Sequence, residues 1–220
     1  MEILFEDKEI VVCIKPVGVL SQADASGREN MINLLTKHCN GSVYPLHRLD
    51  KEVSGVMVYA KQPQAAAYLS REIAQHKFIK EYIALVKGTP TPNEGQLRDL
   101  LFKDSRKNKS FVVDRLRKGV KEALLEYRVL TQTQIDSQTY STVWVRLHTG
   151  RTHQIRVQFA SRKHPLAGDR KYGANDTFTG LGLWSYQITF THPKTRETLN
   201  FNQIPDTPLI KDLQKQLQNI

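Results

Sequence analysis

Cysteine is scarce in this sequence, which has only Cys13 and Cys39, far apart along the chain. They form no Cys-x-x-Cys pair, so the sequence predicts neither a disulfide framework nor a zinc site. Cys13 lies in the strand-like apolar run 10–14, which favours a place in the core over a role as a ligand.

Long apolar runs are also absent. No stretch approaches the ~20 apolar residues that a membrane-spanning helix needs. The N-terminus is acidic and lacks the basic start of a signal peptide. We therefore expect a cytoplasmic protein without a membrane partner.

Acidic residues are also few relative to basic ones. The chain has 22 Asp and Glu against 32 Lys and Arg, a net charge of +10. Such an excess favours a polyanionic partner, either nucleic acid or an anionic membrane surface, although charge alone does not exclude a merely soluble basic protein. The hydrophobic content of 40% is ordinary for a chain with a core, and 220 residues fit one catalytic domain or two small ones.

Strand and turn signals dominate the chain, with fewer helical segments. Helical spacing indicates helices over residues 28–37, from Pro63 to about residue 73, and over residues 152–160. A loop is expected at 88–95, where prolines and glycines gather. Strands are predicted over residues 9–14, 55–60, 79–86, 123–129, 142–147, 183–190 and 198–201.

The segment 47–56 is the most informative part of the sequence. Asp50 follows Arg48 within an otherwise apolar stretch, so its carboxylate should be partly buried and held ionised by positive charge. A helix cap is a weak alternative, because Val53 stands where a capping box needs Glu or Gln. A structural ion pair stays open on residue types alone.

Four segments in order match the motifs of a known family. The chain resembles the RluA family of pseudouridine synthases from about residue 3 to about residue 205. The matching motifs are Lys15-Pro16-x-Gly18, His47-Arg48-Leu49-Asp50 followed by Ser54-Gly55, Lys80-x-Tyr82-x-Ala84, and Gly150-Arg151-Thr152-His153-Gln154-Ile155-Arg156 followed by His164-Pro165 and Gly168-Asp169-x-x-Tyr172-Gly173.

This resemblance implies an α+β pseudouridine synthase fold. Its long mixed, largely antiparallel sheet would carry helices and loops around a central RNA-binding cleft. We expect residues 1–220 to form a single catalytic domain, monomeric and without a separate N-terminal RNA-binding domain. The RNA partner would be ribosomal or transfer RNA. Because the reaction detaches, turns and rejoins uracil without redox change, no cofactor and no metal are expected.

The resemblance also assigns catalytic residues. Asp50 matches the catalytic carboxylate, which either attacks covalently or removes a sugar proton. Tyr82 matches the active-site tyrosine, whose ring could stack on uracil and whose hydroxyl could assist proton removal, although a core tyrosine is commoner. Arg156 matches a basic residue expected to pair with Asp50, against the alternatives of a solvated helix arginine or a phosphate clamp.

Further residues are predicted to bind the substrate. Arg48 would fill the gap left by an extruded base, and Arg151 and His153 would support the site or bind phosphate. A metal site built from His47, Asp50 and His153 fits no common ligand spacing. The other predicted substrate contacts are His47, Lys15, and, within the basic segment 103–121, Lys107 and Lys109.

Two other classes of function compete with the isomerase. One is a non-catalytic RNA-binding factor with the same fold, which the intact Asp50, Tyr82 and Arg156 argue against. The other is a phosphate-handling hydrolase that would use residues 150–152 as an anion-binding helix start. The sequence has neither the phosphate-loop lysine nor the metal-binding cluster of carboxylates that such a hydrolase would need.

Overall fold

The described chain divides into two compact units. A computed structural model of the protein describes residues 1–24 and 27–204. The first unit contains Met1–Lys80 and the described residues from Trp184 onward, and the second unit contains Glu81–Leu183. That both units work as one catalytic domain stays a prediction.

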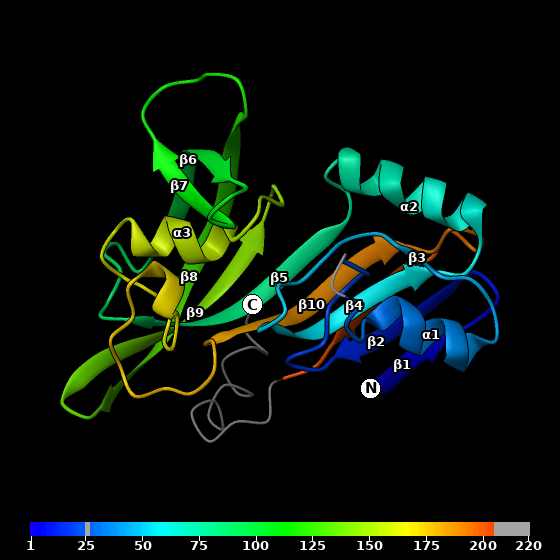
Figure 1. The fold of residues 1–220 in the computed structure, drawn as a ribbon, viewed down its shortest axis with the longest axis horizontal. Coiled ribbons are helices and arrows are strands. Elements are labelled where there is room, and N and C mark those ends of the chain that lie inside the picture. The colour runs from blue at the N-terminus through cyan, green and yellow to red at the C-terminus, as the bar shows by residue number, and fades with distance from the viewer. Residues whose placement is uncertain (25–26, 205–220) are drawn as a thin grey trace. The chain divides into compact units, whose positions relative to one another are not determined.

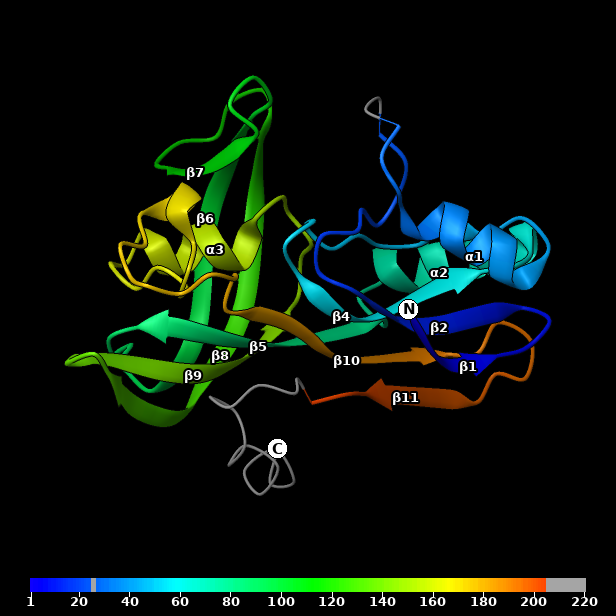
Figure 2. The same ribbon diagram turned by 60° about the horizontal axis from the view of Figure 1, so that its bottom comes forward.

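Strands of the first unit form a sheet in the order β1-β2-β4-β10 (Figure 1). β3 pairs with β4 and β11 with β10, and every pair is antiparallel except β4 with β10, which is parallel. Both helices of this unit lie on one side of its strands (Figure 2). The elements are β1 (Glu2–Glu6), β2 (Ile10–Lys15), α1 (Met31–Cys39), β3 (Tyr44–Pro45), β4 (Ser54–Ala60), α2 (Pro63–Ala74), β10 (Leu183–Thr191) and β11 (Thr198–Asn202).

The two helices have clear local signals at their ends. α1 follows Asn30, whose side chain accepts a hydrogen bond of 3.1 Å from the backbone N–H of Asn33. It ends at Asn40, which adopts the left-handed conformation with φ +48°. α2 begins at Pro63, where a missing backbone N–H costs the helix nothing.

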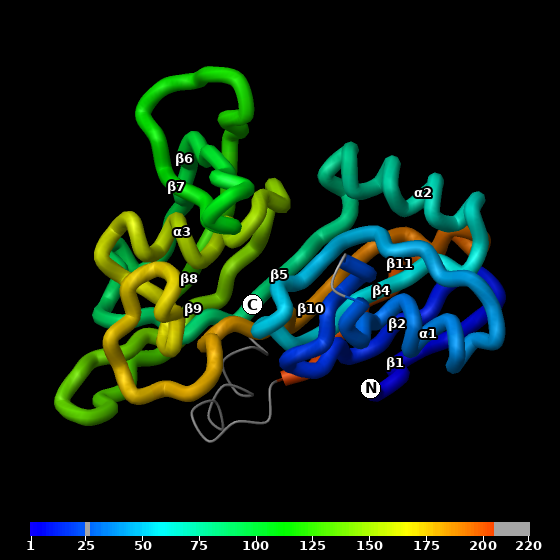
Figure 3. Tube along the Cα trace, viewed as in Figure 1, coloured from blue at the N-terminus to red at the C-terminus, as the bar shows by residue number. Residues whose placement is uncertain are grey.

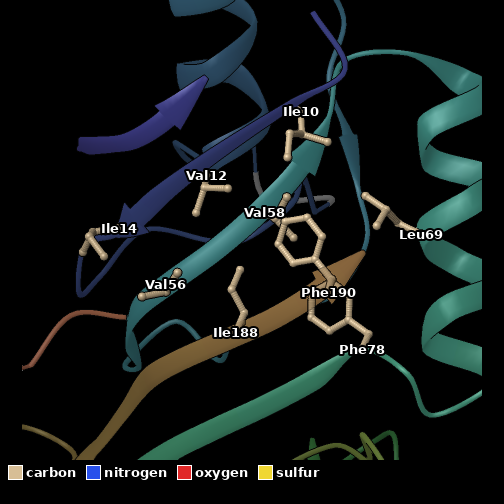
Figure 4. Packing of buried hydrophobic residues seen from close by; sticks show 9 residues of the cluster. All are labelled: Ile10, Val12, Ile14, Val56, Val58, Leu69, Phe78, Ile188 and Phe190. Atoms are coloured by element: carbon tan, nitrogen blue, oxygen red, sulfur yellow. The ribbon is translucent and has the colours of Figure 1, made fainter. Parts of the chain in front are cut away.

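The core of the first unit lies between the strands and α2 (Figure 4). β2 and β4 are buried along their whole length, which explains their continuous apolar sequences. Phe78 stacks on Phe190 with ring centroids 5.3 Å apart. The cluster consists of Ile10, Val12, Ile14, Val56, Val58, Leu69, Phe78, Ile188 and Phe190.

The second unit is built on five antiparallel strands in the order β5-β9-β8-β6-β7. The short helix α3 packs against β6 and β7, and the path from β6 through β7 to β8 can be followed in Figure 3. The elements are β5 (Ile79–Lys87), β6 (Glu94–Asp104), β7 (Lys109–Val113), β8 (Val120–Ile135), β9 (Gln138–Leu147), α3 (Gln154–Ala160) and the 3-10 turn η1 (Arg170–Tyr172).

The predicted α+β class with a long, largely antiparallel sheet is confirmed. Each predicted strand and helix is present within a few residues, except that the strand predicted at 123–129 runs much further, as β8 over Val120–Ile135. The predicted loop 88–95 extends too far, because β6 already begins at Glu94. The sequence did not predict β1, β3, β6 or β7. In β6 the exposed polar residues hide the strand alternation, whereas β7 exposes the neighbouring apolar residues Phe111 and Val112. No helix among the described residues is both long and apolar enough to cross a membrane.

Candidate active site

Asp50 lies in the turn that leads into β4. Its side chain is half-buried, as predicted, and its carbonyl accepts a hydrogen bond of 3.1 Å from the N–H of Val53. A strand follows it rather than a helix, so the prediction that Asp50 is not a helix cap is confirmed. Asp50 belongs to the first unit, whereas Tyr82 and Arg156 belong to the second.

The residue before Asp50 is held by Ser21, to which the sequence analysis gave no role. The Ser21 hydroxyl accepts a hydrogen bond of 2.9 Å from the N–H of Leu49 and donates one of 2.8 Å to the carbonyl of the same residue. Ser21 is itself buried, and its carbonyl accepts a hydrogen bond of 2.8 Å from the Tyr59 hydroxyl.

The residue after Asp50 is held by the Lys15-Pro16-x-Gly18 motif. The Lys51 carbonyl accepts hydrogen bonds from the N–H of Gly18, at 2.9 Å, and from the Lys15 ammonium, at 3.2 Å. The same ammonium donates to the carbonyls of Pro16 and Val19, at 2.9 and 2.7 Å. Backbone on both sides of Asp50 is therefore fixed by groups from residues 15–21.

Burial lowers the pKa of Lys15 to about 8, against the opposing effect of the Glu52 and Asp50 charges. The side chain exposes no surface, and its three protons are donated to three carbonyls. Lys15 is therefore engaged with backbone inside the unit, and its predicted contact with the substrate stays a prediction.

Gly55, from the Ser-Gly pair of the motif, is where β4 and β10 approach closely. It pairs with Ser185, and its φ of +124° is one that other residues rarely adopt. A Cβ atom placed there would lie 2.2 Å from the Ser185 carbonyl oxygen. Only glycine allows the parallel pair that anchors the strand after Asp50.

The neighbouring residues His47 and Arg48 differ in their exposure to solvent. The His47 Nε2 accepts a hydrogen bond of 3.3 Å from the N–H of Val58, and its ring lies 5.6 Å from that of Phe78. Burial, assisted by the Lys80 charge, lowers the pKa of His47 to about 3, so the ring is neutral at pH 7. Arg48 is exposed and forms no ion pair with the described residues, whereas His47 is half-buried. The predicted contacts of both residues with the substrate stay predictions.

Arg156 is held by a buried carboxylate that the sequence analysis placed in a motif without assigning it a role. Its Nε and Nη2 donate to the two oxygens of Asp169, at 2.7 and 2.8 Å. Both side chains are buried, and the guanidinium carbon lies 5.3 Å from the centre of the Tyr172 ring. This arrangement fixes the plane of the guanidinium. The predicted pairing of Arg156 with Asp50 stays a prediction.

Two residues predicted to meet the substrate contact Tyr172, and their role in binding stays a prediction. The His153 Nδ1 lies 3.0 Å from the Tyr172 hydroxyl, which also accepts a hydrogen bond of 2.8 Å from the N–H of Ser110. The Lys109 ammonium lies 4.9 Å from the centre of the Tyr172 ring. His153 is buried and Lys109 is half-buried.

Gln154 and Glu122 engage polar groups of the segment before α3. The N–H of Arg151 donates to the Gln154 Oε1 at 3.0 Å, and the Thr149 hydroxyl donates to the same oxygen at 2.8 Å. The Arg151 Nε donates to the Glu122 carbonyl at 2.7 Å. The backbone N–H and the Nε of Arg151 are therefore engaged within the unit, and its predicted role at the site or at a phosphate stays a prediction.

Tyr82 is buried in β5, opposite Val145 of β9.

The basic segment 103–121 forms the end of β6, β7, the start of β8 and the connections between them. Among the described residues, no three His, Cys, Asp or Glu side chains gather closely enough to hold a metal ion. The exposed cations of the basic segment are Lys103, Arg106, Lys107, Arg115, Arg117, Lys118 and Lys121.

Comparison with known proteins identifies the family. A profile described as RNA pseudouridylate synthase matches residues 9–161. The chain is 30% identical to ribosomal large subunit pseudouridine synthase D of Zymomonas mobilis, over 97% of its own length and 71% of the relative's. It is 31% identical to tRNA pseudouridine synthase C of Haemophilus ducreyi, over 94% of its own length and 91% of the relative's.

A solved structure shares the fold. Human RNA pseudouridylate synthase domain containing 1 superimposes with a TM-score of 0.82 at 21% identity, covering 99% of this chain and 93% of the human one. The residues matched by the profile include Asp50, Tyr82 and Arg156. The chain therefore belongs to the RluA family of RNA pseudouridine synthases and is an isomerase that modifies RNA.

Proposed function

We propose that the protein converts a specific uridine of a structured ribosomal or transfer RNA to pseudouridine, with Asp50 as the catalytic carboxylate. The RNA class is taken from the printed functions of the two bacterial relatives, one ribosomal and one transfer-RNA enzyme. The observation that carries the proposal is the fixed backbone on either side of Asp50, held through Leu49 and Lys51.

This fixation matters because the reaction has demanding geometry. A carbon–nitrogen bond breaks, the uracil turns, and a carbon–carbon bond forms before water can intervene. A carboxylate that must be aligned with the sugar or base gains from a backbone ordered before substrate arrives.

Tyr82 and Arg156 are proposed to support this chemistry. The Arg156 guanidinium is held in one orientation by Asp169, so it can stabilise a carboxylate without first being ordered. The Tyr82 ring can stack on the detached uracil, and its hydroxyl can assist removal of the carbon 5 proton. Neither role requires a cofactor.

RNA binding is proposed to rest on exposed cations rather than on the buried residues near Asp50. Arg48 is exposed two residues before Asp50, where a planar cation can replace the extruded base in the stack. The exposed lysines and arginines of the basic segment would follow the phosphate backbone. Lys109 is set apart from these, because its ammonium already lies against Tyr172.

The test is to map pseudouridines in ribosomal and transfer RNA from cells that carry or lack the gene. We expect one uridine, or a small set, to lose the modification and to regain it with the wild-type gene but not with Asp50→Asn. Asp136→Asn is the matched control, because it makes the same chemical change at an exposed turn where Asn tolerates the φ of +48°. Restoration by Asp50→Asn would refute the proposal.

A further inference from the structure

We infer that Ser21 is a positioning residue for Asp50, an inference that rests on the proposed catalytic role of Asp50. One hydroxyl serves both backbone groups of Leu49, accepting from its N–H at 2.9 Å and donating to its carbonyl at 2.8 Å. Ser21 and Leu49 are 28 residues apart in sequence. Ser21 lies outside the family motifs described in the sequence analysis.

The hydroxyl is a fixed point because its own backbone is held on both sides. The carbonyl of Leu20 accepts a hydrogen bond of 2.8 Å from the first residue of α1, Met31. The Ser21 carbonyl accepts one of 2.8 Å from the hydroxyl of Tyr59, a fully buried residue of β4. A helix and a core strand therefore fix the position of Ser21.

Asp50 thus stands between two held residues. Ser21 holds Leu49 on one side, and Lys15 with Gly18 holds the Lys51 carbonyl on the other. With both neighbours fixed, the direction in which the Asp50 side chain leaves the backbone is also fixed. A misplacement of about 1 Å in such a group can cost about 100-fold in rate.

Ser21 cannot act on the RNA itself. Only 4% of its surface is exposed. Its hydroxyl has a single proton, and that proton is donated to the Leu49 carbonyl. Its effect on the reaction must therefore pass through the backbone next to Asp50.

The experiment compares Ser21→Ala, Ser21→Cys and Ser21→Thr in the full chain. Conversion of a substrate RNA is measured under single turnover with the enzyme saturating, and RNA affinity is measured separately. Ser21→Ala should slow conversion by about 10- to 100-fold, with the dissociation constant changed by less than about twofold because Ser21 is buried. Cysteine fills a similar volume but is a weak hydrogen-bond donor, so it should behave like alanine. Threonine keeps the hydroxyl and should recover most of the rate.

Ser141→Ala is the matched control. Ser141 is buried in β9, and its hydroxyl donates to the Gly88 carbonyl at 2.8 Å. Removing it costs a comparable hydrogen bond in the second unit, so the melting temperature should fall while the conversion rate stays unchanged. All variants are assayed at a temperature at which circular dichroism shows them folded.

The outcomes separate this inference from the proposed function. If Ser21→Ala binds RNA normally and converts it at the wild-type rate, the inference is wrong. An equal loss of rate in Ser21→Ala and Ser141→Ala would also overturn it, because general destabilisation would then explain the loss. A fully active Asp50→Asn would refute the catalytic role of Asp50 whatever the Ser21 variants do.

Discussion

Replacing Gly55 with alanine should cause one of the largest losses of stability from a single methyl group in this protein. The new Cβ would lie 2.2 Å from the Ser185 carbonyl oxygen, and also within 3 Å of the Ser185 nitrogen and carbonyl carbon, at 2.7 and 2.8 Å. These are backbone atoms of β10, so no flexible side chain can move aside. β4 and β10 must separate locally, which disrupts the parallel pair formed by Ser54 with Trp184 and by Gly55 with Ser185.

The loss in the free energy of unfolding has two contributions, one from backbone conformation and one from overpacking. A φ of +124° is unfavourable for alanine, at about 1–3 kcal/mol. Overpacking a close backbone contact adds about 1–3 kcal/mol. A middle value of ~4 kcal/mol lowers the melting temperature by about 8–16 °C, since each kcal/mol is worth ~2–4 °C in a protein of this size.

Two other glycines separate these costs. Gly18 has φ +86° and no atom within 4 Å of an added Cβ, so Gly18→Ala should show the conformational cost alone. Gly41 has no positive φ, and its nearest neighbour would be the Cys39 carbonyl oxygen at 3.8 Å, so Gly41→Ala should be neutral or slightly stabilising. Thermal unfolding followed by circular dichroism should therefore rank Gly41→Ala highest, then Gly18→Ala, then Gly55→Ala. If Gly55→Ala melts within about 2 °C of the wild type, against the 8–16 °C expected from its contacts, this description of the β4–β10 approach is incorrect.

Three predictions concern the chemistry and the RNA. Tyr82→Phe keeps the stacking ring, so uracil should still be released from the sugar while pseudouridine fails to accumulate; an unchanged rate of product formation would exclude the acid–base role of the hydroxyl. Arg48→Ala should slow conversion of a structured stem-loop far more than that of a short unstructured strand, since only the former requires a base to leave a stack, at a few kcal/mol. Equal losses on both RNAs would argue against base displacement. Replacing the exposed Lys107 and Lys118 with alanine should weaken binding and reduce the slope of log affinity against log salt by about 1.4–1.8. Weaker binding with an unchanged slope would contradict direct phosphate contacts.

The parts of the fold that the sequence predicted are those where one physical signal dominates. β2 and β4 are continuous apolar runs because both of their faces are buried, and Pro63 marks the start of α2. β6 was missed because its exposed polar residues hide the alternation, and β7 was missed because its neighbouring apolar residues Phe111 and Val112 are both exposed. Pairing with β8 across a long stretch of chain makes β6 a strand, and a local pattern does not contain that information.

The candidate active site likewise has features that the sequence predicted and features that only the tertiary fold determines. The motifs identified the segments that hold Asp50 and Arg156, but the contacts within them depend on the tertiary fold. Lys15 was predicted to meet the substrate from its place in a family motif, and no local pattern indicated the three backbone carbonyls that surround its ammonium. Ser21 carried no signal in the sequence, and Asp169 stood in a motif that did not identify Arg156 as its partner.

The most direct test of this account is the conversion of substrate RNA by purified Asp50→Asn. The change keeps the shape of the side chain and removes its charge, and the backbone bonds at Leu49 and Lys51 do not involve the carboxylate. Under single turnover with saturating enzyme, we expect no detectable pseudouridine, while RNA affinity and the melting temperature stay close to those of the wild type. Substantial conversion by this variant would contradict the central claim that Asp50 is the catalytic carboxylate.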